Sequence, residues 1–246
     1  MIFVIVLIIT AVRIKSMDSH RISGRILAEN IAGPGMLRLV EQSMQARARK
    51  TSVTEIAVKE RKHPQAALTF DDGPDIRYTP LLLDGLKERN VRVSFFLLGE
   101  KVEQYPELVE RMQKEGHLVG NHTYHHVQLN KLNETKAREE ILKTNNLIYE
   151  TTGVYPLYLR PPFGAWKKNL ELCVEMLPVF WTIDTLDWKV QNTEKIVRTV
   201  QEQIEDGAII LMHDEYDTSV EAALQVVDEL KNQGFELVTV DQLILP

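Results

Sequence analysis

The sequence predicts an α/β fold built on a mostly parallel sheet. From about residue 64 to the end, short apolar runs alternate with longer amphipathic stretches, a pattern that is typical of repeated βα units. The chain has 246 residues, of which 44% are hydrophobic and 26% charged, so a sizeable core is available. Seven strands in this length suit either an open doubly wound sheet or a small, incomplete (β/α) barrel. Periodicity does not decide between these two folds.

The elements follow one another regularly along the chain. Strands are expected at 66–71, 92–98, 117–121, 155–160, 178–184, 207–213 and 235–240. Helices are expected near 79–90, 102–115, 134–151, 167–176, 193–205 and 218–233. In both candidate folds, functional side chains gather at the carboxyl ends of the strands.

Residues 1–12 form an uninterrupted apolar run, MIFVIVLIITAV, followed by Arg13 and Lys15. The run is shorter than the roughly 20 residues that a membrane-spanning helix needs. It also lacks the basic leader and small-residue cleavage site of a clear signal peptide. Two interpretations fit: a short membrane anchor, or an export segment whose true start lies upstream. A buried core strand is the plainer alternative, but the polar, basic stretch that follows argues against it.

Residues 13–63 are basic, with eleven Lys or Arg and five acidic residues, whereas the rest of the chain is acidic, with 18 basic and 30 acidic residues. We interpret 13–63 as a stalk or extension that could lie against anionic lipid. Nucleic-acid binding is the rival hypothesis, but the segment has no aromatic residue on which a base could stack. A plain solvated linker fits equally well. The single cysteine, Cys173, excludes an internal disulfide and lies in a helical pattern typical of a buried thiol.

Two adjacent carboxylates, Asp71 and Asp72, end the first expected strand and lead into a Gly-Pro turn. Side chains alternate along a strand, so both acids cannot enter a core unless the chain turns there. We therefore expect both at the mouth of a pocket, one to bind a cation and one to accept a proton. A solvated acidic turn is the alternative, because Asp, Gly and Pro all favour turns.

Two histidines follow the third expected strand, within Gly-Asn-His-Thr-Tyr-His-His at 120–126. His122 and His126 are four residues apart, and on one helical turn this spacing would place both rings on the same face. With one carboxylate of the Asp pair they would form a two-His, one-carboxylate site that suits zinc and other divalent metals. We interpret His125 as a surface or capping residue.

Three later segments place further polar residues at strand ends. Arg160 stands in Leu-Arg-Pro-Pro-Phe-Gly after the fourth strand, where it could pair with a carboxylate and keep it ionised. The fifth strand ends in Asp-Thr-Leu-Asp-Trp at 184–188, two acids and an aromatic residue suited to stacking on sugars. The sixth ends at His213, a residue type that often serves as a general acid or base near neutral pH.

Taken in order, the five segments resemble the motifs of the NodB-homology polysaccharide deacetylases, carbohydrate esterase family 4. They read Thr-Phe-Asp-Asp, His-Thr-x-x-His, Arg-x-Pro-Phe-Gly, Asp-Thr-x-Asp-Trp and Leu-x-His. The resemblance covers roughly 64–246 and does not extend into 1–63. It implies a distorted, incomplete (β/α) barrel of about seven parallel strands, with 64–246 as the catalytic domain.

The resemblance also implies a role for each matching residue. Asp72, His122 and His126 would hold the metal, and Asp71 would be the catalytic base. Arg160 would tether Asp71, while Asp187 would orient His213 as the general acid. Trp188 and Leu211 would line the pocket for the acetyl methyl group. Phe163 stands where the family usually has tyrosine, and its backbone N–H would stabilise the oxyanion.

The implied function is metal-dependent removal of N-acetyl groups from N-acetylglucosamine residues of a cell-wall or extracellular polysaccharide, with acetate released. Zinc is the expected metal, and cobalt is the alternative. Peptidoglycan is the favoured substrate, because an exported enzyme with this site resembles the peptidoglycan N-acetylglucosamine deacetylases. Action on N-acetylmuramic acid is less expected, because relatives that act on this sugar often carry asparagine where Asp72 stands. An O-acetyl esterase acting on a xylan-type glycan and a non-catalytic glycan-binding protein are the alternatives. The expected partner is thus an acetylated glycan rather than nucleic acid, and the expected location is extracytoplasmic, secreted or tethered through residues 1–12.

Overall fold

The computed structural model describes residues 62–166 and 176–244, which belong to one unit, Arg61–Pro246. The apolar segment 1–12, most of the basic segment 13–63, Cys173 and most of the helix expected at 167–176 lie outside the described residues. Within the described ranges, no helix is both long enough and apolar enough to cross a bilayer.

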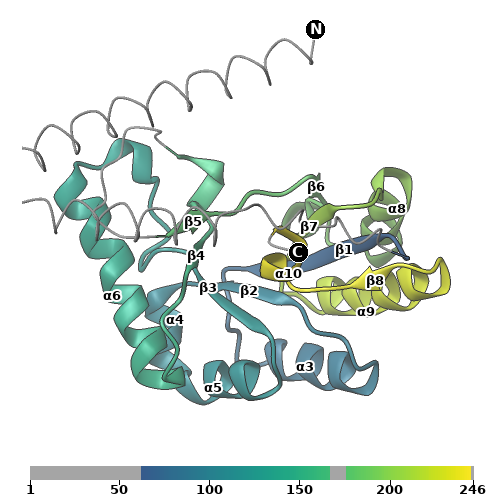
Figure 1. Ribbon diagram of the computed structural model, residues 1–246, viewed down its shortest axis with the longest axis horizontal. Helices are drawn as coiled ribbons and strands as arrows, with labels where there is room; N and C mark the ends of the chain where they lie inside the picture. The colour runs from purple at the N-terminus through teal and green to yellow at the C-terminus, as the bar shows by residue number, and fades with distance from the viewer. Residues whose placement is uncertain (1–61, 167–175, 245–246) are drawn as a thin grey trace, which may run out of the picture. The chain divides into compact units, whose positions relative to one another are not determined.

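The described residues form one parallel sheet that curls into a distorted, incomplete (β/α) barrel, as the resemblance of the five motifs implies (Figure 1). Its strand order is β5-β4-β3-β2-β1-β7-β6, and β8 pairs with β1 off this path. The strands are β1 (Gln65–Asp71), β2 (Ser94–Leu97), β3 (Leu118–Asn121), β4 (Tyr158–Leu159), β5 (Leu177–Pro178), β6 (Ile183–Asp184), β7 (Ala208–His213) and β8 (Glu236–Leu237).

The strand expected at 178–184 is instead split between the two edges of the sheet. Its first residues belong to β5, which pairs with β4, and its last belong to β6, which pairs with β7. Between them, Val179 donates a backbone hydrogen bond to Leu159 and Thr182 donates one to Ile209. This segment therefore passes from one edge of the sheet to the other, and it leaves the barrel incomplete because its two short strands are not paired with each other.

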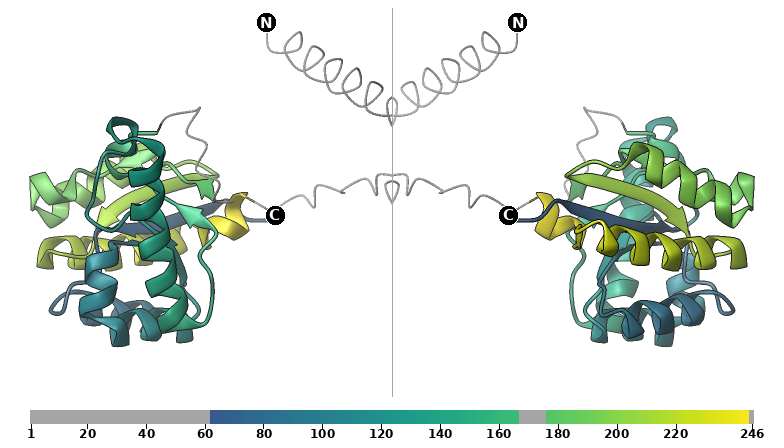
Figure 2. Two further views of the ribbon diagram at one scale, coloured as in Figure 1. Left: turned by 90° about the vertical axis from the view of Figure 1, so that its left-hand side faces the viewer. Right: turned by 90° about the vertical axis from the view of Figure 1, so that its right-hand side faces the viewer.

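The longer helices lie on the convex side of the sheet. Figure 1 shows α6, α5, α3, α9 and α8 following one another around it, and the side views show α6 covering one end and α8 with α9 the other (Figure 2). The helices are α3 (Thr79–Glu88), α4 (Gly99–Gln104), α5 (Pro106–Lys114), α6 (Glu134–Thr152), α7 (Asp187–Val190), α8 (Thr193–Gln203), α9 (Asp217–Asn232) and α10 (Val240–Ile244). Two short 3₁₀ turns are η1 (Leu129–Lys131) and η2 (Pro162–Gly164).

The helix expected at 102–115 is two helices that meet at Tyr105. Proline disfavours the helical conformation in the residue before it, and Tyr105, which precedes Pro106, has φ −132° and ψ 56°. Pro106 then begins α5, where the absence of an N–H costs nothing because the first turn has no intrahelical acceptor for it. Proline thus explains why α4 ends and α5 begins at this point.

Side chains along β1 point alternately to the hydrophobic core under the helices and to the concave face of the sheet. Leu68 and Phe70 face the helices in the main hydrophobic cluster, which includes residues of β2, α3, α5, α8 and α9. Ala67 faces the concave side, in a second cluster with Phe96 and Val240. Because strand side chains alternate, Thr69 and Asp71 share this concave side with Ala67.

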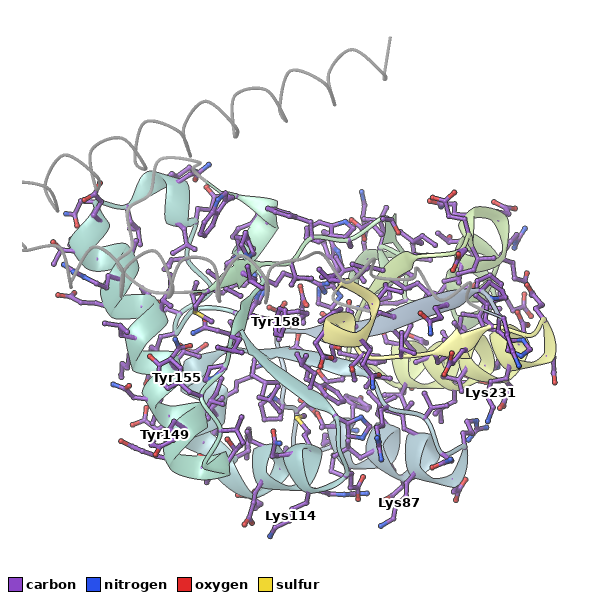
Figure 3. All side chains as sticks on the ribbon, in the orientation of Figure 1. Lys87, Lys114, Tyr149, Tyr155, Tyr158 and Lys231 are labelled. Atoms are coloured by element: carbon purple, nitrogen blue, oxygen red, sulfur yellow. The ribbon has the colours of Figure 1, made fainter. Side chains whose placement is uncertain are left out.

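Three of the longer helices carry a lysine in their last turn: Lys87 in α3, Lys114 in α5 and Lys231 in α9 (Figure 3). Positive charge is favourable near a helix C-terminus, where the helix dipole is negative. In βα units the helices run antiparallel to the strands, so these C-termini lie near the amino ends of the strands. The carboxyl ends, where function is expected, are at the opposite end of the sheet.

Candidate active site

A cavity of about 420 Å³ opens at the carboxyl ends of the strands, and Asp71, Asp72, His122, His126 and His213 all line it. These residues come from three parts of the chain: the end of β1, the segment after β3 and the end of β7. Neighbouring parallel strands bring segments that are far apart in sequence to one edge of the sheet. The structure thus brings together the polar residues that the sequence singled out.

Asp71 is held by a buried arginine on the concave face. Nη1 of Arg160 lies 2.8 Å from Oδ1 of Asp71 and 2.6 Å from Oγ1 of Thr69. The guanidinium also lies 4.3 Å from the ring centroid of Phe96. Burial lowers the pKa of Arg160, and Asp71 partly offsets this; an arginine stays cationic even so. Arg160 is fully enclosed, and Asp71 is buried except where it lines the cavity, so the position of the Asp71 carboxylate is fixed.

Asp72 turns away from its neighbour because its backbone leaves the strand conformation, with φ at 69°. Its Oδ1 lies 3.4 Å from Nε2 of His122 and 3.4 Å from Nε2 of His126. One ligand atom from each of the three residues lies within 4.8 Å of the others. Oδ1 is buried, and no residue in the described part of the chain gives it a hydrogen bond. A buried carboxylate oxygen without a donor is costly, and a bound cation would compensate for it.

The protonation states of this trio also suit a cation. Nδ1 of His122 lies 2.6 Å from the backbone oxygen of Arg160, so Nδ1 donates this hydrogen bond and Nε2 is left as the ring nitrogen that faces Asp72. Burial lowers the pKa of His126 and favours its neutral form. Burial raises the pKa of Asp72, but His122, His126 and His213 outweigh this and hold it well below its ordinary value. Two neutral imidazoles and one carboxylate fit a divalent metal with open coordination positions.

The expectation that His122 and His126 lie on one helical turn is wrong. They lie in an irregular segment between β3 and η1, in which Thr123 has φ 66° and His126 has φ 55°. Each such conformation costs about 1–3 kcal/mol in a residue other than glycine. Asp72, Phe163 and Leu186, which line the same cavity, also have positive φ. Backbone strain is therefore concentrated around the site.

His213 faces this trio from the other side and is paired with Asp187. Oδ1 of Asp187 lies 2.8 Å from Nδ1 of His213, and its Oδ2 accepts the backbone N–H of His213 at 2.8 Å. Burial alone would lower the pKa of His213, but the hydrogen bond and charge of Asp187 outweigh it and raise the pKa to about 9. His213 therefore carries a proton at neutral pH, and its Nε2 lies 3.8 Å from Oδ2 of Asp72.

Apolar side chains form the walls of the cavity. The sequence-predicted residues Phe163, Trp188 and Leu211 all line it; Phe163 is 63% exposed and Trp188 is 49% exposed. Trp181 and Tyr216 also line it and were missed by the motif reasoning. Tyr216 follows His213 by three residues and Trp181 precedes β6, so proximity to a strand end is the one signal that could have identified them.

Comparison with known proteins finds that residues 58–180 match the family described as polysaccharide deacetylase. The chain is 41% identical over 185 residues to "Peptidoglycan-N-acetylglucosamine deacetylase PgdA" of Listeria monocytogenes, covering 75% of this chain and 40% of that protein. It is 42% identical over 177 residues to "Peptidoglycan-N-acetylmuramic acid deacetylase PdaC" of Bacillus subtilis, covering 72% of this chain and 38% of that protein. The chain thus spans about two fifths of the length of these relatives.

Two solved structures show the same fold. The structure of PdaC from Bacillus subtilis has a TM-score of 0.72 at 41% identity and covers 74% of this chain and 91% of that one. The structure of BA3943 from Bacillus anthracis, described as a pseudoenzyme, has a TM-score of 0.70 at 28% identity and covers 74% of this chain and 66% of that one. Similar folds thus occur in an enzyme and in a pseudoenzyme, so activity has to be argued from the site residues.

Proposed function

This chain belongs to the polysaccharide deacetylase family, and from the geometry of its site we propose that it is a metal-dependent hydrolase that removes N-acetyl groups from N-acetylglucosamine residues of peptidoglycan. One observation carries the proposal. The Asp72–His122–His126 trio shares one cavity with Asp71 and His213. Behind the cavity wall, Asp71 is paired with the buried Arg160 and His213 with the buried Asp187.

The two pairs are suited to opposite proton transfers. Arg160 holds the Asp71 carboxylate in place, so Asp71 can accept a proton from an attacking water. Asp187 keeps His213 protonated, so His213 can donate a proton to a leaving group. A carboxylate that accepts a proton and a histidine that donates one, both facing the same cavity, are the arrangement that acid–base catalysis requires.

In the proposed reaction, water adds to the carbonyl carbon of the acetamide while Asp71 removes one of its protons. The C–N bond then breaks as His213 donates its proton to the nitrogen, and the products are acetate and a free amino sugar. We assign the backbone N–H of Phe163 to the developing oxyanion. A divalent metal held by Asp72, His122 and His126, with zinc as our first choice and cobalt as the alternative, supplies Lewis-acid activation of water and of the carbonyl group.

The walls of the cavity suit an acetylated sugar. Trp188 and Leu211 offer apolar surface for the acetyl methyl group, and Phe163 and Trp181 offer faces for a pyranose ring. The relatives PgdA and PdaC are described as acting on different sugars of peptidoglycan, and their identities to this chain are nearly equal. Our preference for N-acetylglucosamine therefore rests on the presence of aspartate at position 72.

We further propose that the protein acts outside the cytoplasm, where peptidoglycan lies, and that residues 1–12 tether or export it. The apolar character of 1–12 and the basic charge of 13–63 support this part of the proposal.

The decisive experiment measures acetate release by the full chain from peptidoglycan, chitooligosaccharides and acetylated xylan, with and without a chelator. We expect release from the N-acetylated glycans, loss of activity on chelation, and recovery with zinc or cobalt. Asp71→Asn is the matched control, because it keeps the shape of the site and removes the base. Release from xylan alone would identify an O-acetyl esterase. Binding of a glycan without any release by the metal-loaded protein would identify a non-catalytic binding protein.

A further inference from the structure

The segment that carries His122 and His126 needs an external support. It contains two residues with positive φ, Thr123 and His126, and such conformations persist only where the surrounding structure determines them. Because His126 itself is one of the two, its ring is placed by a backbone conformation that the segment would not adopt by preference.

The first half of this segment is held from three directions. Oδ1 of Asn121 accepts the backbone N–H of Thr123 at 2.6 Å, and the backbone oxygen of Thr123 accepts the N–H of Gly99 at 2.9 Å. His122 is fixed through its ring, since Nδ1 bonds to the backbone oxygen of Arg160. None of these contacts reaches the residues between Thr123 and His126.

Tyr124 has contacts of its own, since its backbone oxygen accepts the N–H of Glu100 at 3.3 Å and its hydroxyl group bonds to Glu103. Glu140, which lies in α6, binds both Tyr124 and His125. Oε2 of Glu140 accepts the backbone N–H of Tyr124 at 3.1 Å and that of His125 at 2.9 Å. Its Oε1 lies 2.8 Å from Nδ1 of His125. The Glu140 side chain is only 16% exposed, so water competes weakly for its oxygens. A single carboxylate thus binds both residues that precede His126.

We propose that Glu140 is a positioning residue for the metal site, and that it acts through the backbone of Tyr124 and His125 to hold His126 beside Asp72. The proposal rests on the metal site of the proposed function. It gives the two histidines different supports: His122 is oriented by the Arg160 carbonyl group and His126 by Glu140. Outer partners of metal ligands typically contribute 10–100-fold in metal affinity.

The contact between the Glu140 carboxylate and the His125 ring is not the important one in this proposal. The His125 side chain is 58% exposed, and even a charged pair at an exposed position contributes little. His125→Ala removes that contact and keeps both backbone hydrogen bonds to Glu140. Glu140→Gln keeps one acceptor oxygen for the backbone N–H groups, whereas Glu140→Ala keeps none. Glu139, the exposed neighbour in the same helix, provides the matched control, because Glu139→Gln makes the same change in charge.

The test measures the zinc dissociation constant of the metal-free full chain by competition with a chelating dye, together with the visible spectrum of the cobalt-loaded protein. We expect Glu140→Ala to weaken zinc binding about 10–100-fold and to change the cobalt spectrum. Glu140→Gln should fall between Glu140→Ala and the wild type, and His125→Ala and Glu139→Gln should stay within about twofold of the wild type. Circular dichroism of each metal-free variant shows whether it is folded.

Zinc affinity of folded Glu140→Ala within twofold of the wild type would overturn the proposal, as would an equal loss in Glu139→Gln. If Glu140→Ala does not fold, the zinc affinity of Glu140→Gln is compared with that of Glu139→Gln. An affinity of Glu140→Gln within twofold of the wild type, or an equal loss in both variants, would then overturn the proposal. Failure of the wild-type protein to bind zinc or cobalt would instead overturn the metal-dependent function. The two failures are therefore distinguishable.

Discussion

His117 should make the stability of this protein depend on pH far from the active site. It lies just before β3, is 4% exposed, and its Nδ1 accepts the backbone N–H of Val93 at 3.1 Å. That hydrogen bond requires an unprotonated Nδ1. Burial, together with the positive charges of Arg92 and Arg111, lowers the pKa of His117 to about 4, although Glu115 opposes the shift.

The direction in which stability changes with pH follows from proton binding to His117. Between the ordinary histidine pKa of about 6.5 and the folded value of about 4, the unfolded chain binds more protons than the folded one. Stability from this group is therefore complete above pH 6.5 and is lost as pH falls toward 4. Lowering the pKa of His117 from its ordinary value to about 4 corresponds to about 3 kcal/mol of unfolding free energy.

The assay compares wild type with His117→Asn, whose side-chain oxygen can accept the Val93 N–H and does not titrate. Urea unfolding with a chelator present, followed by tryptophan fluorescence, gives the unfolding free energy at pH 7.5 and pH 4. The variant should be less stable at pH 7.5, where the imidazole packs better, and the difference should shift by about 3 kcal/mol in favour of the variant at pH 4. Burial raises the pKa of Asp214 to about 7, but that group is common to both proteins and cancels. A difference that is the same at both pH values would refute the reasoning.

Two further predictions concern the metal and the N-terminal segments. Asp72→Ala should lose bound zinc, whereas Asp71→Asn should keep zinc and lose turnover. Zinc content and acetate release are measured on each variant. Equal zinc loss in both variants would show that both acids act as ligands. Residues 64–246 expressed alone should be soluble and active, and deletion of 1–63 should move the protein from the membrane fraction to the soluble fraction. Misfolding of the shortened chain would show that the N-terminal quarter contributes to the core.

Most of the fold was predictable because apolar periodicity reports which face of an element is buried. The predicted range 66–71 differs from β1 by one residue, and 134–151 differs from α6 by one residue. Periodicity does not report which edge of a sheet a strand joins, so 178–184 appeared as one strand although its ends pair on opposite edges. Because periodicity also does not report which strands pair, it left the choice between an open sheet and a barrel undecided.

The site shows the same division between residue type and backbone geometry. Acids and histidines at strand ends could be identified because each needs a partner that a neighbouring strand end supplies. The backbone that places them could not, because it depends on positive φ at Thr123 and His126, a conformation that neither residue favours. Glu140 illustrates the limit further: in the sequence it is one of several acids in α6, and only the fold reveals that its oxygens face the histidine segment.

The role of His213 can be separated from that of the metal by the choice of leaving group. An amide nitrogen is a poor leaving group unless it is protonated as the C–N bond breaks. The phenol of an activated aryl acetate, in contrast, leaves readily as the phenolate anion. If His213 is the general acid, His213→Ala should lose about 10²-fold or more on N-acetylglucosamine oligomers, the usual scale for a positioned acid, and much less on the aryl acetate.

Asp187→Asn should show the same pattern as His213→Ala, with a larger loss on the amide than on the aryl acetate. The reason is that Asp187 binds both Nδ1 and the backbone N–H of His213. Zinc content measured on each variant provides the control, since His213 lies 3.8 Å from Asp72 and its removal could disturb the ligand. Equal losses on the amide and the aryl ester, with zinc still bound, would contradict the assignment. His213 would then act by shaping the metal site, and the proton for the leaving amine would have to come from another group in the cavity.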